Sequence, residues 1–267
     1  MRNSVVRPSL TFYGLVAITV LGGILTIVDS PLDVELFGDK YFLTSQQHHS
    51  VGTIGVLLLV IGGWALSLTL HEFGHAITAY RGGDLSVADK GYLTMDVRRY
   101  TDPVFSLVLP IVFVIAGGIP LPGGAVWINN WALRSRAISS RVSLAGPLTN
   151  LVFGAVLVAI VAFVHLPSGL AFGLSYLALL QILAFVLNIL PIPGLDGYGA
   201  IEPYLSPEAR ELGAKARPWA PLVLFMLLFA VPSVGQAFSE VSHFIFNHLG
   251  GDSRLSDFGS YAFRFWN

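Results

Sequence analysis

The chain has 267 residues, of which 54% are hydrophobic and only 12% are charged, whereas a soluble domain usually carries about 25% charged residues. It contains no cysteine, which excludes disulfides and thiolate metal ligands, and its net charge of −1, without a basic tract, argues against a nucleic-acid partner. We therefore expect an integral membrane protein in which membrane-spanning segments make up most of the chain.

The first two apolar segments predict two membrane spans. Residues 9–28 are uncharged, and about 20 such residues are enough to cross a hydrocarbon core. This segment follows basic residues as a signal peptide does, but it lacks a convincing small-residue cleavage site, so we expect it to be retained. The acidic stretch at residues 29–50 then forms a loop. A second span covers residues 51–80 and ends at a Gly-Gly pair.

The segment after the second span changes its periodicity. Between residues 91 and 99, the apolar Leu93, Met95 and Val97 alternate with polar residues, which is the spacing of a β-strand. Residues 104–128 are again uncharged, but prolines and glycines interrupt them repeatedly. A straight spanning helix would not normally carry so many breakers, so this segment predicts a short re-entrant or β-hairpin element.

No charged residue occurs from residue 142 to residue 195, a stretch that holds two further spans, at residues 147–165 and 170–190. Pro147 is expected at the first position of its helix. The segments that follow are a polar helix, a short apolar run and an amphipathic segment, at residues 202–217, 219–231 and 238–249. The whole pattern predicts an all-α polytopic membrane protein with about five to six transmembrane helices.

His71, Glu72 and His75 form an HExxH pattern at the end of an uncharged run, residues 41–70. Histidines four positions apart lie on one face of a helix, which suits two imidazoles on one Zn²⁺, and the glutamate beside them is free to act on a bound water. Charged and metal-binding residues inside a hydrophobic helix are costly, which favours a functional role. The alternative is a chance match of a short pattern at a helix end.

Asp196 follows a Pro-Gly-Leu turn and is a candidate third ligand, although an aspartate is also common in turns. If it binds the same ion, it lies on the same side of the membrane as His71 and His75. The two spans before it cross and return, so residues 104–128 must begin and end on one side. The positive-inside rule supports this arrangement, because it gathers the basic residues on one side and leaves the acidic loop on the other. We therefore expect a multi-pass protein of the cell membrane with its site towards the cytoplasm.

Three separated segments contribute to this candidate site: the HEFGH pattern, the sequence SLAGPLTN at residues 143–150 and the sequence NILPIPGLDG at residues 188–197. In this order and spacing, over residues 51–200, they resemble the site-2 protease family of intramembrane zinc metalloproteases. The resemblance does not extend to diagnostic motifs in the first span or in the C-terminal part.

The resemblance implies one Zn²⁺ per chain, bound by His71, His75 and Asp196. It also implies that Glu72 is the catalytic base and that Asn150 lies near the substrate. The chemistry agrees, because two histidines and one carboxylate leave the fourth zinc position to a water whose pKa falls to about 7. Glu72 can take a proton from that water, and the Asn150 amide can donate to the oxyanion. The alternative for Asn150 is a hydrogen bond between membrane helices.

Substrate binding is expected at several further residues. Proteolysis needs an extended peptide, which could add to the edge of the expected strand at Leu93 and Val97 or to the hairpin-like stretch at residues 120–126. Asn150 could also bind the substrate main chain. Asn188 is a further candidate, unless it orients the turn of the carboxylate ligand or only packs. The alternative for the strand is that it merely covers the site.

We therefore predict an intramembrane zinc metalloendopeptidase, a hydrolase that cuts peptide bonds in or near transmembrane segments in regulated intramembrane proteolysis. Its partners are a transmembrane protein substrate and the lipid bilayer. Because no segment has room for an accessory domain, regulation is expected from a membrane partner, from a prior cut in the substrate or from the tail. A metal-binding or metal-transport protein of the membrane that uses the same ligands is the alternative. The expected parts are the first span with its extracytoplasmic loop, the catalytic membrane core and the C-terminal helix with its apolar span and tail, at residues 1–50, 51–200 and 201–267.

Overall fold

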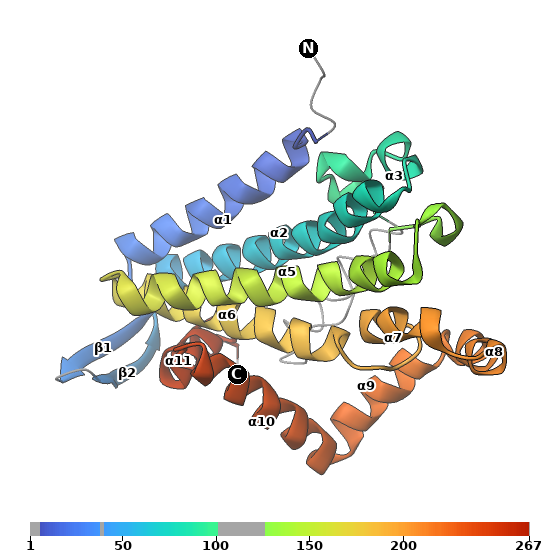
Figure 1. Ribbon diagram of the computed structural model, residues 1–267. Coiled ribbons are helices and arrows are strands. Elements are labelled where there is room, and N and C mark those ends of the chain that lie inside the picture. The colour runs from blue at the N-terminus through green and yellow to red at the C-terminus, as the bar shows by residue number, and fades with distance from the viewer. Residues whose placement is uncertain (1–5, 38–39, 101–125, 267) are drawn as a thin grey trace.

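The computed structural model describes residues 6–37, 40–100 and 126–266. Its centre is a bundle of long helices that run side by side (Figure 1), namely α1 (Leu10–Val28), α2 (Ser50–Gly82), α5 (Arg136–Phe163) and α6 (Ser168–Asn188). Among the described residues, these 4 helices are long and apolar enough to cross a membrane, and a fifth span results if α8 (Pro207–Ala216) and α9 (Ala220–Ala230), bent by 61°, count as one. The predicted all-α membrane fold is confirmed.

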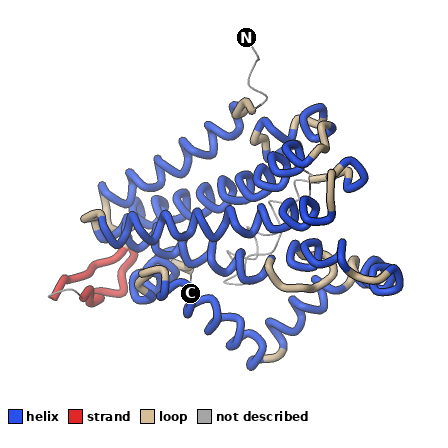
Figure 2. The backbone as a smooth tube through the Cα atoms, viewed as in Figure 1, coloured by secondary structure: helices blue, strands red, loops and turns tan. Residues whose placement is uncertain are grey.

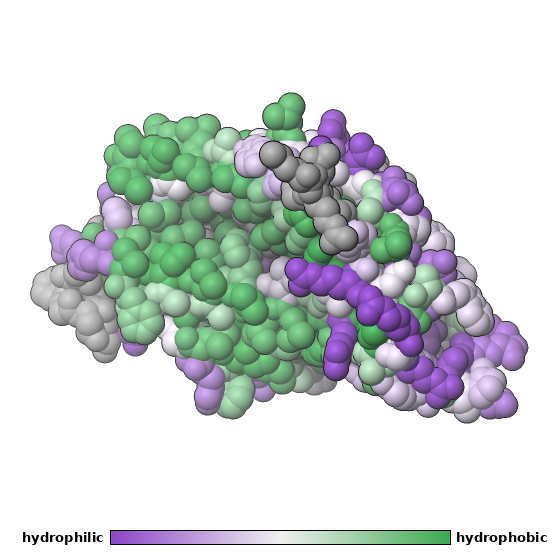
Figure 3. Space-filling view, turned by 45° about the horizontal axis from the view of Figure 1, so that its top comes forward, coloured by the Kyte–Doolittle hydropathy of each residue, from purple (hydrophilic) through white to green (hydrophobic). Residues whose placement is uncertain are grey.

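Helix α6 lies at the centre of the bundle and α1 at its edge. Of the most apolar stretch of each helix, 78% is buried in α6 but only 17% in α1. Glycines let α1 approach α2 closely, because a Cβ on Gly22 would collide with the main chain of Leu59. Figure 3 shows apolar residues over much of the molecular surface and hydrophilic residues gathered towards the end where α3 (Ser86–Asp89) and α8 lie. This distribution suits a protein whose middle lies in hydrocarbon.

Helix α5 begins at Arg136 rather than at Pro147, so the expectation that Pro147 opens this helix was wrong. Ser135 caps the helix, because its side-chain oxygen accepts a hydrogen bond of 3.2 Å from the N–H of Ile138. Pro147 therefore lies inside the helix, where it cannot donate to the carbonyl of Ser143.

Residues 91–99 are not a strand. They form two 3₁₀ turns, Tyr92–Thr94 and Val97–Arg99. Between these turns, Met95 has a φ of 51°, and the side chain of Asp96 caps the second turn. A left-handed residue and a side chain that bonds its local backbone both interrupt an extended conformation.

Leu93 and Val97 lie in a buried apolar cluster against the end of α2, only 1% and 4% exposed. The alternation that resembled a strand arises because residues four apart in successive turns face the same core. The strand prediction was therefore wrong, and its argument for substrate binding at Leu93 and Val97 no longer holds. Most of the expected re-entrant or hairpin-like element falls on residues 101–125, which lie outside the described part of the chain.

A hairpin that the sequence did not predict lies at the other end of the bundle from α3 (Figure 1). The strands β1 (Leu32–Phe37) and β2 (Lys40–His48) pair antiparallel where only an acidic loop is expected (Figure 2). His49 lies just before α2. Its Nε2 is 3.0 Å from Oδ1 of Asp33, and its Nδ1 is 3.4 Å from Oδ1 of Asp29. These contacts connect the hairpin with the start of α2.

The C-terminal part packs back onto the bundle. After α6 come a short helix α7 (Asp196–Ile201) and a 3₁₀ turn η5 (Glu202–Tyr204), followed by α8 and α9 near the predicted polar and apolar segments. Helix α10 (Pro232–His248) contains the predicted amphipathic segment, and α11 (Ser253–Phe263), which the sequence did not predict, lies against α6.

Candidate active site

Helix α2 carries the HExxH pattern into the interior of the bundle. His71 and His75 lie one turn apart on the face that meets α5. Both imidazoles are buried, and their Nε2 atoms lie 3.1 Å apart. Two nitrogen ligands of a tetrahedral Zn²⁺ are about 3.3 Å apart, so this spacing fits a shared ion.

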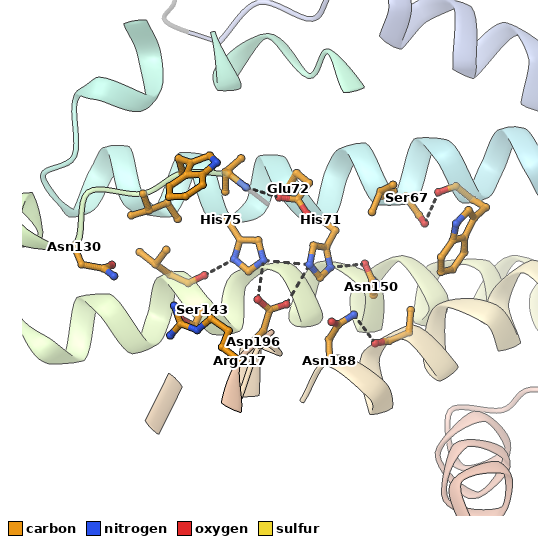
Figure 4. Close-up of a pocket in the computed structure, with 18 residues that line it drawn as sticks. Ser67, His71, Glu72, His75, Asn130, Ser143, Asn150, Asn188, Asp196 and Arg217 are labelled. Atoms are coloured by element: carbon orange, nitrogen blue, oxygen red, sulfur yellow. Dashed lines mark hydrogen bonds and ion pairs between the residues drawn. The ribbon is translucent and has the colours of Figure 1, made fainter. Parts of the chain in front are cut away.

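Asp196 reaches the same point from a distant part of the chain. It is the first residue of α7, and the turn before it contains Gly194, whose φ is 99°. Its Oδ2 lies 3.2 Å from Nε2 of His71 and its Oδ1 lies 3.4 Å from Nε2 of His75 (Figure 4). The structure thus brings the three expected ligands together, and within the described residues they form the one group of three that could hold a metal ion.

The other ring nitrogens of both histidines are already bonded. Nδ1 of His75 lies 2.7 Å from the carbonyl oxygen of Val142, and Nδ1 of His71 lies 3.2 Å from the amide oxygen of Asn150. These oxygens only accept, so each Nδ1 carries the proton and each Nε2 presents its lone pair. Such partners fix the tautomer and the ring orientation of metal-binding histidines. Asn150 therefore lies at the site, as expected, but its contact is with a candidate ligand.

Gly146 on α5 leaves room for an ion. A Cβ at this position would overlap Nε2 of His75 and lie 2.5 Å from Nε2 of His71. Gly74 allows the same close approach from α2, because its Cβ would lie 2.7 Å from Oγ1 of Thr149. Two imidazoles and one carboxylate around this space are a donor set that catalytic Zn²⁺ takes, so the expected zinc cofactor fits the residues present.

Burial raises the pKa of Asp196, but positive charge on the neighbouring His75 and His71 outweighs burial and holds this pKa well below its usual range. The three side chains are thus arranged around a positive charge, which a proton or a metal ion at the Nε2 atoms would supply.

Glu72 lies beside the candidate ligands and is only 2% exposed. Its Oε2 accepts a hydrogen bond of 3.1 Å from the backbone N–H of Val126. Within the described residues, Oε1 has no hydrogen-bond partner. The main chain thus holds one oxygen of this carboxylate in place.

The segment that supplies this N–H is held by side chains near the end of α2. The carbonyl of Trp127 accepts a hydrogen bond of 2.7 Å from Nζ of Lys90, and the N–H of Asn129 donates to Oδ2 of Asp84 at 2.7 Å. The other oxygen of Asp84 accepts from the N–H and the hydroxyl of Ser86. Asp84 directly follows the Gly-Gly pair at the end of the second span, and nothing in the local sequence indicates its bond to a residue so distant in the chain.

A cavity of about 550 Å³ connects these groups (Figure 4). Its lining also includes Ser143, the first residue of the SLAGPLTN segment, and three residues that sequence reasoning missed because no short motif marks them: Trp64, Ser67 and Arg217. Asn188 lines the cavity as well, but its amide nitrogen donates to the carbonyl of Ala184 at 3.0 Å. Among the described hydrogen bonds, none joins Asn188 to Asp196.

Known relatives cover almost the whole chain. It is 43% identical over 264 residues, 98% of this chain and 95% of the relative, to the "Putative zinc metalloprotease Rip2" of Mycobacterium tuberculosis. The chain belongs to the site-2 protease family. It is also 40% identical over 269 residues to the protein of the same name from Mycolicibacterium smegmatis, which covers 100% of this chain and 97% of that protein.

A more distant site-2 protease relative is the "Putative zinc metalloprotease YwhC" of Bacillus subtilis, 29% identical over 181 residues, which are 62% of this chain and 78% of that protein. No protein-family model matches the chain, and no solved structure matches it. Membership of the site-2 proteases agrees with the apolar helices and with the metal-binding group, and it supports a zinc protease of the membrane.

Proposed function

We propose that this protein is a multi-pass intramembrane zinc metalloendopeptidase. The observation that carries the proposal is the convergence of His71, His75 and Asp196 on one point, with the carboxylate of Glu72 beside it. This point lies on a helix long and apolar enough to span a membrane, next to a cavity that has room for a peptide. The alternative of metal transport lacks support, because the described residues contain no second group of three ligands along a path.

In the proposed reaction, His71, His75 and Asp196 hold the zinc. When bound, zinc supplies a water of lowered pKa and polarises the peptide carbonyl. Glu72 would accept a proton from the attacking water through Oε1, while the N–H of Val126 keeps Oε2 in place. The water oxygen adds to the carbonyl carbon, the C–N bond breaks, and Glu72 returns the proton to the leaving nitrogen. Asn150 keeps His71 oriented throughout.

The charge distribution supports a cytoplasmic site. Most of the described basic residues lie near the end of the bundle that carries α3 and α8, whereas the acidic hairpin of β1 and β2 lies at the other end, together with Arg254 and Arg264 of the α11 region (Figure 1). Cytoplasmic flanks of membrane spans carry an excess of Lys and Arg. The active site would then meet its substrate where a transmembrane segment leaves the inner leaflet, and the product would be released into the cytoplasm. A membrane partner would regulate the cut.

The test is cleavage of a designed substrate in detergent micelles. The substrate has one alanine-leucine transmembrane segment with an Asn-Gly pair to unwind it, and fragments are read by mass spectrometry. The wild-type protein should cut it, and Glu72→Gln should lose at least about 100-fold in rate, as expected for a lost general base, while it keeps its zinc. Glu240→Gln, the same change at an exposed position on α10, is the matched control. Equal cleavage by wild type and Glu72→Gln would refute the assigned base.

A further inference from the structure

The cavity has two chemically different ends. In Figure 4, Ser67 lies towards one end and Asn130 and Arg217 towards the other, with the candidate ligands between them. Trp64 and Leu68, which neighbour Ser67 on α2, add apolar surface to the first end, where Asn150 and Asn188 are uncharged polar groups. The two ends of the cavity therefore differ in charge, because the described lining residues place a basic side chain only at the other end.

Arg217 gives the polar end a permanent positive charge. Among the described lining residues it is the only lysine or arginine. Its main chain lies against the turn that carries the third ligand, because a Cβ on Gly194 would meet the carbonyl oxygen of Arg217 at 3.1 Å. The cation is thus built into the same unit that delivers Asp196 to the site.

The guanidinium of Arg217 already binds one carboxylate. Its Nη2 donates to both oxygens of Glu202, at 2.8 and 3.0 Å. Within the described residues, Nε and Nη1 make no hydrogen bond, and 52% of the side chain is exposed. A guanidinium has five donors in a planar fork that suits carboxylates, so donors remain for a second one.

We propose that Arg217 is a specificity residue that binds an acidic side chain of the substrate, located just outside the apolar segment that is cut. This inference rests on the proposed protease function and names its substrate class: a transmembrane segment followed directly by aspartate or glutamate. The carboxylate of Glu202 on the same guanidinium weakens this attraction, because it repels a second carboxylate.

The charge would select by repulsion as well as by attraction. Segments that leave a membrane on the cytoplasmic side usually carry Lys or Arg. An arginine at this end of the cavity disfavours such flanks, so the many ordinary membrane proteins are rejected and the few with acidic flanks are accepted. For a half-exposed ion pair, we expect a substrate with aspartate to bind about fivefold more tightly than one with asparagine. A substrate with lysine at this position should bind more weakly still.

The test measures binding rather than cleavage, so that it does not depend on the proposed chemistry. Three fluorescent peptides carry the same alanine-leucine segment followed by Asp, Asn or Lys, and their affinities for Glu72→Gln are compared by anisotropy at low ionic strength. The aspartate peptide should bind about fivefold more tightly than the asparagine peptide. Adding Arg217→Gln should abolish this ratio, and adding Arg217→Glu should make lysine the preferred residue.

Lys215→Gln is the matched control, because Lys215 lies in the last turn of α8, which Arg217 caps, and pairs with Glu211 at 2.7 Å but does not line the cavity. It should leave the ratio unchanged. Glu202→Gln keeps Arg217 but removes the negative charge that Glu202 places on its guanidinium. This variant should increase the preference for aspartate, and it tests the proposal even if the Arg217 variants fail to fold. Equal binding of the three peptides, or a ratio that survives Arg217→Gln, would overturn the proposal. Failure of the protease function would instead show as no cleavage of the aspartate peptide by the wild type.

Discussion

The amide oxygen of Asn150 on α5 lies 3.2 Å from Nδ1 of His71 on α2, although the two residues are 79 positions apart in the chain. This contact gives Asn150 a role behind the metal ligand that the sequence alone did not indicate. Outer partners of metal-bound histidines contribute measurably to the affinity for the metal.

Asn150→Ala should weaken zinc binding by about 10- to 100-fold, since His71 loses the acceptor that fixes its tautomer. Asn150→Asp keeps an acceptor and should retain most of the affinity. Zinc affinity is measured by competition with a fluorescent chelator. Leu148→Ala, an exposed position on the same helix, serves as the control. Unchanged affinity in Asn150→Ala would show that the contact does not support the ligand.

Gly146→Ala should prevent zinc binding, because the added methyl group would occupy the space beside both Nε2 atoms. Zinc per chain, measured by mass spectrometry of the metal, should fall close to zero. Gly154→Ala is the matched control on the same helix, because its Cβ would meet Ile182 at 3.0 Å but no candidate ligand. It should cost stability and keep zinc. A fully zinc-loaded Gly146→Ala protein would contradict this location of the ion.

Asp84→Ala should loosen the segment that contacts Glu72. Asp84 is 1% exposed and accepts hydrogen bonds from Ser86 and from the N–H of Asn129. Hydrogen bonds to a charged group contribute about 1.5–3 kcal/mol, so the melting temperature should fall and the rate of cleavage should decrease. Hydrogen exchange at the amide of Asn129 reports the local effect. Asp89→Ala, at an exposed position in α3, should leave the melting temperature, the rate of cleavage and the exchange at Asn129 unchanged. Slow exchange at Asn129 in Asp84→Ala would mean that other contacts hold the segment.

Removal of zinc should lower thermal stability as well as activity, because an ion that binds only the folded state stabilises it. At a zinc concentration about 1,000-fold above the dissociation constant, the gain is about 4.1 kcal/mol. The melting temperature is compared with and without a chelator, and added zinc should restore it. The melting temperature of Asp196→Asn should not change when the chelator is added. The melting temperature of Asp257→Asn, a change at an exposed position on α11, should fall as in the wild type. A shift that persists in Asp196→Asn would assign the ion to another site.

Local spacing was enough to predict part of the site. His71 and His75 lie on one helix face because 3.6 residues make a turn, and a long uncharged run forms a spanning helix wherever it occurs. The wrong strand at residues 91–99 marks the limit of such reasoning. There the alternation was real, but Met95 and Asp96 turn the backbone.

The sequence by itself determined the apolar helices, the pair of histidines and, through its motifs, the candidate third ligand Asp196. Only the tertiary structure decided that Asn150 supports His71, that Gly146 leaves space for the ion and that Arg217 faces the same cavity. The physical reason is the distance along the chain over which each kind of interaction acts. Periodicity and caps act between neighbours in the chain, whereas these contacts depend on how α2, α5 and the turn before α7 pack against one another.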